Sequence, residues 1–400
     1  MSVSNVDKKS AEGEVAVRLV NYTDVYYGDR LSPAMDLMEA TATLGQVKAF
    51  RVRPGDVVIT KDSETADDIG IPAFVESSSG DMVLGYHLAL LRPRDGAITG
   101  RYLYWAMSSD DARGQLSTGA TGVTRFGLRR DVITSTVLSV PSAREQCVIA
   151  EFLDTETARI DALITKKRRM IDLLRERFWT GVVSAIERAQ AEIVPLRRAL
   201  RYITDGPFGS SLTSSHYSTD GARVVRLGNI GFAEFKDDDR AFISLDHFNQ
   251  LSRHRVLAGH LLIAGLGDAN NHVGRACVAP DLGPALVKAD CYCAEVEGAR
   301  GDADFLALFL SSPAGATHVA LAARGTTRSR INLDIAKAIS VPLPAVAVQT
   351  RIVSEAKKLR ATAAETMDKL SLQITLLQEH RQAMITAAVT GELAIPGVAA

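Results

Sequence analysis

The two halves of this chain repeat one another at a constant spacing. A shift of 203 residues superposes Gly122-Val-Thr-Arg125 on Gly325-Thr-Thr-Arg328, Asp131 on Asp334, Pro141 on Pro344, Gln146 on Gln349, Ile149 on Ile352, and Ile171-Asp-Leu-Leu174 on Ile374-Thr-Leu-Leu377. This period far exceeds the roughly 20–50 residues of solenoid repeats. The sequence therefore predicts two tandem domains of the same kind, in keeping with a length of 400 residues that exceeds one ordinary core.

Each half begins with a globular part and continues into one long helix. The globular parts contain short apolar runs, such as residues 57–59 and 261–263, between clusters of Gly, Pro, Asp and Asn that are typical of strands and turns. The stretches from Arg144 to about Ala189 and from Val346 to about Val389 contain no proline, and Gly181 is their only glycine. We therefore expect an α+β protein with two α/β domains and two long helices.

The two long stretches carry apolar residues at alternating spacings of three and four, which is typical of a coiled-coil seam. The residues expected to form this helix-pairing seam are Ile149, Leu153, Ile160, Leu163, Leu174, Ile352, Leu359, Leu370 and Leu377. Because the second helix starts at the second globule, it must run back antiparallel along the first to bury its seam. We expect a dumbbell with an approximate two-fold axis and helices roughly 70 Å long, at about 1.5 Å per residue.

The repeat and the helices together predict the limits of five segments. These are a first globule at 1–142, a first helix at 143–192, a second globule at 193–342, a second helix at 343–393 and a tail at 394–400.

Composition limits the classes of function. The formal net charge is −1, whereas a protein that binds nucleic acid alone is often strongly basic, so DNA binding would need local positive charge or a partner. No apolar run reaches the roughly 18 residues of a membrane span, and the polar N-terminus argues against a signal peptide. The four cysteines, Cys147, Cys277, Cys291 and Cys293, are expected to be buried reduced thiols of a cytoplasmic protein rather than a zinc site.

The sequence has no motif that indicates catalysis. It lacks an Asn-Pro-Pro-Tyr motif, a glycine loop for a methyl donor and a Gly-x-x-x-x-Gly-Lys-Ser/Thr phosphate loop. Its eight histidines include no pair with convincing metal-ligand spacing. The stretch Thr204-Asp-Gly-Pro-Phe-Gly-Ser-Ser-Leu212 lacks the lysine of a phosphate loop, and a tight backbone path explains its glycines better. We expect a chain that is non-catalytic by itself and holds no metal.

Several stretches, taken in order, resemble the specificity subunits of type I restriction-modification systems over nearly the whole length. They are Val17-Arg-Leu-Val-Asn-Tyr-Thr-Asp-Val-Tyr-Tyr27, Val140-Pro141, Glu145-Gln146, Asp205-Gly-Pro-Phe-Gly-Ser-Ser-Leu212, Val225-Arg-Leu-Gly-Asn-Ile230, Val341-Pro-Leu-Pro344, Gln349-Thr-Arg-Ile352 and Ala388-Val-Thr-Gly-Glu-Leu393. The resemblance implies two target-recognition domains that each read one half of a split, asymmetric DNA site. It also implies helices that fix the spacer, and two modification subunits that dock on this scaffold and methylate adenine.

The same resemblance implies further partners and a location. Restriction subunits with a translocating motor would join the complex. S-adenosylmethionine, ATP and Mg would belong to the partner subunits, and this chain would hold no cofactor. The complex would act on double-stranded DNA in the cytoplasm of a bacterium or archaeon, with no membrane partner.

Two departures from the family pattern stand out. The first half has no counterpart of residues 206–212, so the first recognition domain is shortened. The missing segment is dispensable, or is replaced by a partner or by the chain's own C-terminal end. In the second helix Val348 stands where the family usually has Glu.

DNA readout needs Arg, Asn or Gln at base edges and basic or hydroxyl groups on phosphates. The candidate DNA-binding residues are Thr124, Arg125, Arg129, Arg130, Asn270, Asn271, Arg275, Thr327, Arg328 and Arg330. The alternative is that these residues are solvated surface charge or stabilise turns. Residues shared by both halves suit phosphate contact or a structural role, so unshared ones are better candidates for base readout. The first-half counterpart of the loop at 265–275 is residues 61–70, which are acidic and so not expected on phosphates.

Two other functions remain as alternatives. One is a coiled-coil scaffold that carries two protein-interaction domains and does not bind DNA. The other is a self-sufficient enzyme, which the missing catalytic motifs disfavour.

Overall fold

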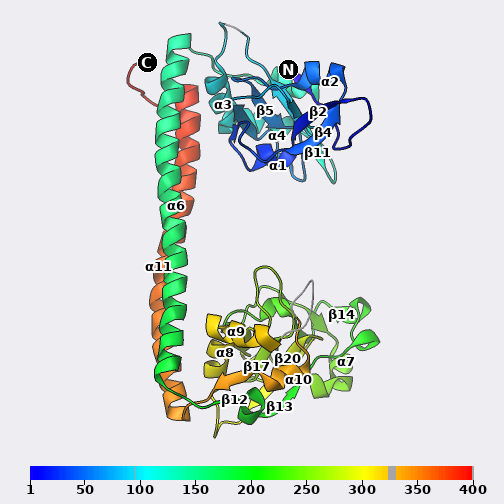
Figure 1. Ribbon diagram of the computed structural model, residues 1–400, viewed down its shortest axis with the longest axis vertical. Coiled ribbons are helices and arrows are strands. Elements are labelled where there is room, and N and C mark those ends of the chain that lie inside the picture. Colours follow the sequence, from blue (N-terminus) through cyan, green and yellow to red (C-terminus); the bar gives the residue numbers. More distant parts are fainter. Residues whose placement is uncertain (95, 323–329, 399–400) are drawn as a thin grey trace. The chain divides into compact units, whose positions relative to one another are not determined.

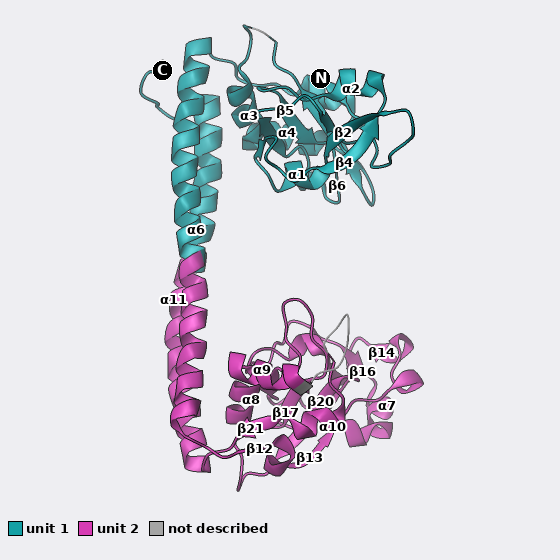
Figure 2. Ribbon diagram, in the orientation of Figure 1, with its two compact units in different colours: residues 1–168, 371–400 teal, residues 169–370 magenta. Residues whose placement is uncertain are grey.

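The computed structural model describes residues 1–94, 96–322 and 330–398 (Figure 1). Two compact units make up the chain (Figure 2): unit 1 comprises residues 1–168 and 371–400, and unit 2 comprises residues 169–370. Two long helices, α6 (Ala143–Arg188) and α11 (Val346–Thr390), each contribute one half to each unit. The expected α+β class with two long helices is confirmed. The unit boundaries cut through both helices, so the five segment limits remain predictions from the sequence.

Unit 1 is built on a five-stranded sheet in the order β1-β9-β5-β7-β3. Its strands are β1 (Ser2–Val3), β3 (Arg30–Leu31), β5 (Val57–Thr60), β7 (Pro72–Val75) and β9 (Leu88–Leu91). Two three-stranded sheets, β4-β2-β8 and β10-β11-β6, consist of β2 (Val15–Val20), β4 (Met38–Ala42), β6 (Asp62–Ser63), β8 (Met82–Leu84), β10 (Thr121–Gly122) and β11 (Phe126–Gly127). The short helices are α1 (Tyr22–Tyr26), α2 (Leu44–Phe50), η1 (Ala66–Asp68), α3 (Gly100–Ser108), α4 (Asp110–Gly119) and α5 (Arg130–Ser135).

Unit 2 has two four-stranded sheets, in the orders β13-β20-β17-β18 and β14-β16-β15-β19. Their strands are β13 (Leu200–Thr204), β14 (Tyr217–Ser218), β15 (Ala222–Val225), β16 (Phe242–Ile243), β17 (Leu261–Ala264), β18 (Ala276–Val278), β19 (Ala285–Val287) and β20 (Cys291–Val296). Strands β12 (Ile193–Pro195) and β21 (Ser340–Pro342) form a separate pair. The helices are η2 (Leu196–Ala199), η3 (Gly209–Ser211), η4 (Ser214–His216), η5 (Leu227–Asn229), α7 (Leu245–Gln250), η6 (Ser252–His254), α8 (Ala303–Ser311), α9 (Pro313–Ala322) and α10 (Leu333–Ala338).

The two globules share one topology, which confirms the sequence repeat. In unit 1, β5 lies between its antiparallel neighbours β9 and β7, and in unit 2, β17 lies between β20 and β18 in the same way. The parallel pair β2 and β8 corresponds to the parallel pair β15 and β19. All residues of β5 and β17 are buried, because a central strand covered on both faces needs a continuous apolar run rather than alternation.

One helix in each globule packs against the long helices. In unit 1 the buried side chains of α3, such as Tyr102 and Trp105, share a core with Leu153 of α6 and Ile385 of α11. In unit 2 the buried side chains of α8 share a core with Phe178 and Val182 of α6 and with Ile352 of α11. These cores fix each globule to the part of the helix pair that belongs to its own unit.

A buried glutamine makes the same three hydrogen bonds at the start of each long helix. Gln146 accepts from the amide of Thr99 at 2.8 Å and donates to the carbonyls of Ala97 and Pro141 at 3.2 and 2.9 Å. Gln349 accepts from the amide of Asp302 at 2.8 Å and donates to the carbonyls of Arg300 and Pro344 at 3.0 and 2.7 Å. Every partner in unit 2 is the repeat equivalent of the partner in unit 1, so the repeated Gln-and-Pro pattern is structural.

The long helices pair in an antiparallel manner within each unit. In unit 1, Asp161 of α6 forms an ion pair with Arg381 of α11 at 3.1 Å, and Lys167 donates to Gln373 at 2.7 Å. Five of the predicted seam residues are buried, namely Ile149, Leu153, Ile160, Ile352 and Leu370. Two more, Leu174 and Leu377, are half-buried.

One predicted seam residue is wrong, and another is only partly covered. Leu163 is 42% exposed, and its neighbour Ile164, at 5%, takes the buried position. Leu359 is 49% exposed but still faces α6, since a Cβ on Gly181 would lie 3.5 Å from its Cδ1. Its neighbour Arg360 also takes part in the pairing, with its guanidinium 4.9 Å from the centre of the Phe178 ring. An apolar pattern cannot separate adjacent apolar residues or foresee an arginine whose stem packs on an aromatic ring.

The C-terminal segment lies in the core of unit 1. Ile395 is buried there, and Leu393 and Val398 pack against the same core. At the other end of the chain, β1 pairs with β9 as β13 pairs with β20. The three possibilities for the missing counterpart of residues 206–212 in the first domain remain predictions from the sequence.

The stretch at 204–212 enters the second globule by a close backbone approach. A Cβ on Gly206 would lie 2.1 Å from the carbonyl carbon of Lys288, and Gly209 has a φ of +62°. The expected tight backbone path is therefore present, and it leaves the side chain of Phe208 55% exposed.

The cysteines differ from the expectation at one position. Cys277, Cys291 and Cys293 are buried free thiols, and burial raises the pKa of Cys277 and Cys293 to about 12. Cys147, in the first turns of α6, is exposed, so its predicted burial is wrong. No described helix is long and apolar enough to cross a membrane.

Candidate nucleic-acid interface

In unit 1 the fold brings two predicted segments side by side. Strand β6, in the acidic loop at 61–70, pairs with β11, in the hairpin that carries Thr124 and Arg125. Gly122 closes this hairpin, because a Cβ there would lie 2.0 Å from the carbonyl oxygen of Arg125. The tip is open to solvent: Val123 is 94% exposed, and Thr124 and Arg125 are also exposed.

Tyrosines of α1 lie next to this hairpin and loop. Tyr26 donates to Asp68 at 2.5 Å, which raises the pKa of Tyr26 to about 12. Its ring stacks on Tyr22, with centroids 5.3 Å apart, and meets Tyr27 edge to face at 4.8 Å. Tyr22 is close enough to Arg125 for an electrostatic interaction, and Tyr27 is 82% exposed. This aromatic surface beside an exposed arginine was not among the predicted site residues.

The other unit 1 candidates lie at the start of α5. Arg129 is exposed and donates to Asp131 at 3.1 Å, in an ion pair whose two side chains are about two-thirds exposed. Arg130 is exposed, and it makes no ion pair with a described residue. An exposed pair such as that of Arg129 contributes little to stability, so both arginines are available to a ligand.

In unit 2 the loop between β17 and β18 holds two asparagines in different ways. The Asp268 carboxylate accepts from the amides of Asn270 and Asn271 at 2.8 and 2.9 Å. It also accepts from the Asn271 side chain at 3.0 Å, and these bonds lower the pKa of Asp268. The side chain of Asn270 is exposed and has no partner among the described residues. The loop therefore fixes Asn271 and presents Asn270 to solvent.

The structure removes Arg275 from the candidates. It is 4% exposed, and its guanidinium donates to the carbonyls of Ile230 at 2.7 Å, Leu227 at 2.9 Å and Leu266 at 3.1 Å. Burial lowers the pKa of Arg275, and the carbonyls satisfy its donors. This arginine ties the η5 turn to the β17–β18 loop and is a structural residue.

Of the remaining unit 2 candidates, the structure describes Arg330. Arg330 is 55% exposed and forms an ion pair with Asp290 at 2.8 Å. Its backbone forms a bridge with Leu266, so it borders the β17–β18 loop. Thr327 and Arg328 lie outside the described residues.

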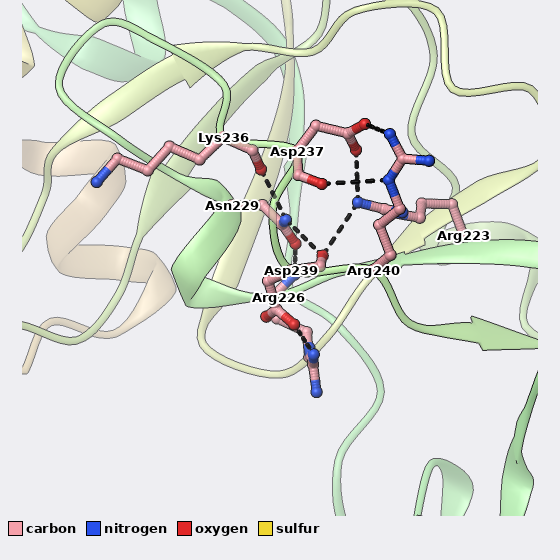
Figure 3. Close-up of polar contacts among 7 residues, drawn as sticks. All are labelled: Arg223, Arg226, Asn229, Lys236, Asp237, Asp239 and Arg240. Atoms are coloured by element: carbon pink, nitrogen blue, oxygen red, sulfur yellow. Dashed lines mark hydrogen bonds and ion pairs between the residues drawn. The ribbon is translucent and has the colours of Figure 1, made fainter. Parts of the chain in front are cut away.

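A charged network holds the segment at 236–240 against β15 and η5 (Figure 3). Arg223, 5% exposed, donates to Asp237 at 2.6 Å and to the carbonyl of Asp239 at 3.0 Å, and burial lowers its pKa. Arg240 also contacts Asp237, and Arg226 contacts Asp239. Arg223 is thus enclosed by its partners and unavailable to phosphates, whereas Arg240 is 63% exposed.

The same network explains one stretch that carries the family resemblance. Asn229 is fully buried; its side chain accepts from the amide of Arg226 and donates to the carbonyls of Lys236 and Asp239, each at 2.8 Å. Arg226-Leu-Gly-Asn229 therefore forms a fixed turn. Among the described residues no cluster of three or more His, Cys, Asp or Glu side chains could hold a metal.

Comparisons with known proteins agree with this fold. No protein-family model matches the chain. It is 21% identical over 374 residues to the type I restriction enzyme EcoBI specificity subunit of Escherichia coli, covering 87% of this chain and 76% of that protein.

Solved structures show the same likeness. A chain from a study of complex assembly and conformational transition of the type I R-M system superposes with a TM-score of 0.70 at 15% identity, covering 95% of this chain and 93% of the other. The HsdS subunit of Thermoanaerobacter tengcongensis gives a TM-score of 0.46 at 15% identity, covering 95% and 92%. The chain thus resembles type I specificity subunits in sequence and has a fold seen in a type I system.

Proposed function

We propose that the chain is the DNA-recognition subunit of a type I restriction-modification complex and that each globule reads one half of a bipartite, asymmetric site. One observation carries the proposal beyond the likeness to known subunits. The two globules share a topology, yet the loop after β5 is acidic and the equivalent loop after β17 presents asparagine. A common scaffold with unlike loops suits the reading of two different half-sites.

The exposed residues divide into two kinds of contact. In unit 1, Thr124 and Arg125 recur in the other half and suit phosphate and sugar contacts that position the globule, whereas Arg129 and Arg130 do not recur and suit base readout. Asn270 in unit 2 suits base readout, because an asparagine side chain can donate to and accept from one adenine edge. The net charge of −1 is compatible with this division if partner subunits supply part of the positive field.

The long helices would set the spacer between half-sites and dock two modification subunits. Large apolar side chains on them are exposed: Leu163, Leu372 and Leu376 in unit 1, and Met170 and Leu173 in unit 2. Exposed apolar residues in such number support a docking role for the helices.

Chemistry would belong to the partners rather than to this chain. The modification subunits would methylate adenine with S-adenosylmethionine, and restriction subunits would use ATP and Mg to translocate DNA. The complex would act in the cytoplasm of a bacterium or archaeon, and this chain would be non-catalytic by itself.

Methylome sequencing tests the proposal. Cells that lack adenine methylation would express this chain together with its modification subunit, and control cells would express the modification subunit alone. We expect methyladenine in one bipartite motif with a fixed gap, only when both proteins are present. An unmodified genome despite a modification subunit that is active with another specificity subunit would refute the proposal and favour the scaffold without DNA binding.

A further inference from the structure

In unit 1 the globule is positive and the long helix is negative where the two meet. Asp154 of α6 accepts from Arg30 of β3 at 2.9 Å and from the indole Nε1 of Trp105 at 3.0 Å. Arg101, near the start of α3, forms an ion pair with the same carboxylate. The Asp154 side chain is only 20% exposed, so these three partners largely surround its carboxylate.

In unit 2 the signs are reversed. Lys357 of α11 forms an ion pair with Asp304 of α8 at 2.7 Å. One turn further, Arg360 donates to the carbonyls of Ala233 and Phe232 at 2.7 and 3.1 Å. Burial lowers the pKa of Arg360, and the carboxylates of Glu234 and Asp304 oppose that shift. Here the helix is positive and the globule supplies the acceptors.

These contacts occupy equivalent positions of the repeat. The shift of 203 residues places Arg101 on Asp304 and Asp154 on Lys357. The buried glutamines, with equivalent partners in both units, show that the shift is structurally correct at this interface. The fold is therefore conserved while the polarity of the globule–helix contact is inverted.

We infer that the two globule–helix interfaces are keyed by charge, so that each globule accepts the start of the long helix that follows it in the sequence and rejects the start of the other long helix. Globule 2 placed on the start of α6 would set Asp304 against Asp154, and globule 1 placed on the start of α11 would set Arg101 against Lys357. The attraction in such partly exposed pairs is small, so discrimination comes mainly from the repulsion in the wrong pairing. This inference does not depend on DNA recognition.

Charge reversals in the full-length chain test the inference, with neutral substitutions as matched controls. Lys357→Met removes the attraction in unit 2, whereas Lys357→Asp adds a repulsion against Asp304. Asp154→Asn and Asp154→Lys form the corresponding pair in unit 1. The readout is hydrogen-exchange protection of the α8 amides for unit 2 and of the α3 amides for unit 1, at low and high salt.

Charge keying predicts that each reversal lowers protection more than its neutral control. In unit 2, where Lys357 and Asp304 are exposed, the reversal should lower the protection of the α8 amides about two-fold more than the neutral control does. In unit 1, where the Asp154 side chain is mostly buried, the extra loss of protection in α3 should be about ten-fold or more. Both extra losses should shrink in high salt. The double variant Asp304→Arg/Lys357→Asp, which copies the unit 1 polarity, should regain the lost protection. Reversals no more harmful than the neutral controls, or a double variant no better than Lys357→Asp, would overturn the inference.

Discussion

The buried glutamine at the start of each long helix allows a quantitative prediction. Gln146 is 1% exposed and holds one amide and two carbonyls of two separate segments, residues 97–99 and Pro141. Gln146→Ala removes the partner of these three groups, which the folded chain shields partly from solvent. A buried polar group that loses its partner costs about 1–3 kcal/mol. Because the Thr99 amide loses its bond outright while solvent can partly reach the carbonyls, we expect a loss of about 3 kcal/mol in the free energy of unfolding.

The repeat supplies an internal comparison for this value. Gln349 makes the equivalent three bonds at nearly equal distances and is fully buried. Gln349→Ala should therefore cost the same amount, in unit 2 instead of unit 1. Gln378 is exposed on α11, and Gln378→Ala should change stability by less than about 0.5 kcal/mol.

The two tryptophans of the chain allow the units to be followed separately. Trp105 belongs to unit 1 and Trp179 to unit 2. Urea unfolding followed by fluorescence in a Trp179→Phe background reports on unit 1, and Trp105→Phe reports on unit 2. A loss of about 3 kcal/mol should lower the affected midpoint by about 1–2 M urea. A loss below about 0.5 kcal/mol in the free energy of unfolding, or a loss confined to the unit that does not carry the substitution, would refute the reasoning.

Two further predictions concern titratable groups. Burial raises the pKa of Asp205 to about 6, so the folded chain holds this proton more tightly than the unfolded chain does. The free energy of unfolding of unit 2 should therefore fall by of the order of 1 kcal/mol as the pH rises from about 4 to 6, a value that takes into account that the group is half-exposed. Asp205→Asn should remove that slope from urea midpoints measured across this range, and an unchanged slope would contradict the assignment. A maleimide should label Cys147 alone in the native protein at pH 7, because the other thiols are buried with raised pKa values; rapid labelling at Cys277 would contradict the structure.

The larger features of the fold could be predicted from the sequence because they rest on periodicity. A constant shift between halves indicates two like globules, and long stretches without proline indicate two helices. Side-chain details were harder to predict. Leu163 and Ile164 are both apolar, and only the helix phase set by the partner decides which is buried.

The candidate site was predicted only in part, for a similar reason. Arginine is usually a surface residue, so Arg275 was taken as a DNA contact although backbone carbonyls enclose it. Tyr22 and Tyr26 were missed because the proximity of Tyr22 to Arg125 and the hydrogen bond of Tyr26 to Asp68 depend on tertiary packing. The repeat identified Gln146 and Gln349 as equivalent, but their shared structural role became clear only from their hydrogen bonds.

Unit 1 is built from two segments that are far apart in the sequence, and this has a consequence for biosynthesis. Its core takes residues from both the first and the last part of the chain, including Leu153 and Ile395, with about 200 residues of unit 2 between them. Ribosomes add roughly 5–20 residues per second, so the first globule waits roughly 10–40 seconds for the segment that completes its core. Unit 2, which is continuous, has its whole sequence available before then. The first globule to be translated is thus the last to be finished, and its unfilled core is a surface that chaperones can bind during synthesis.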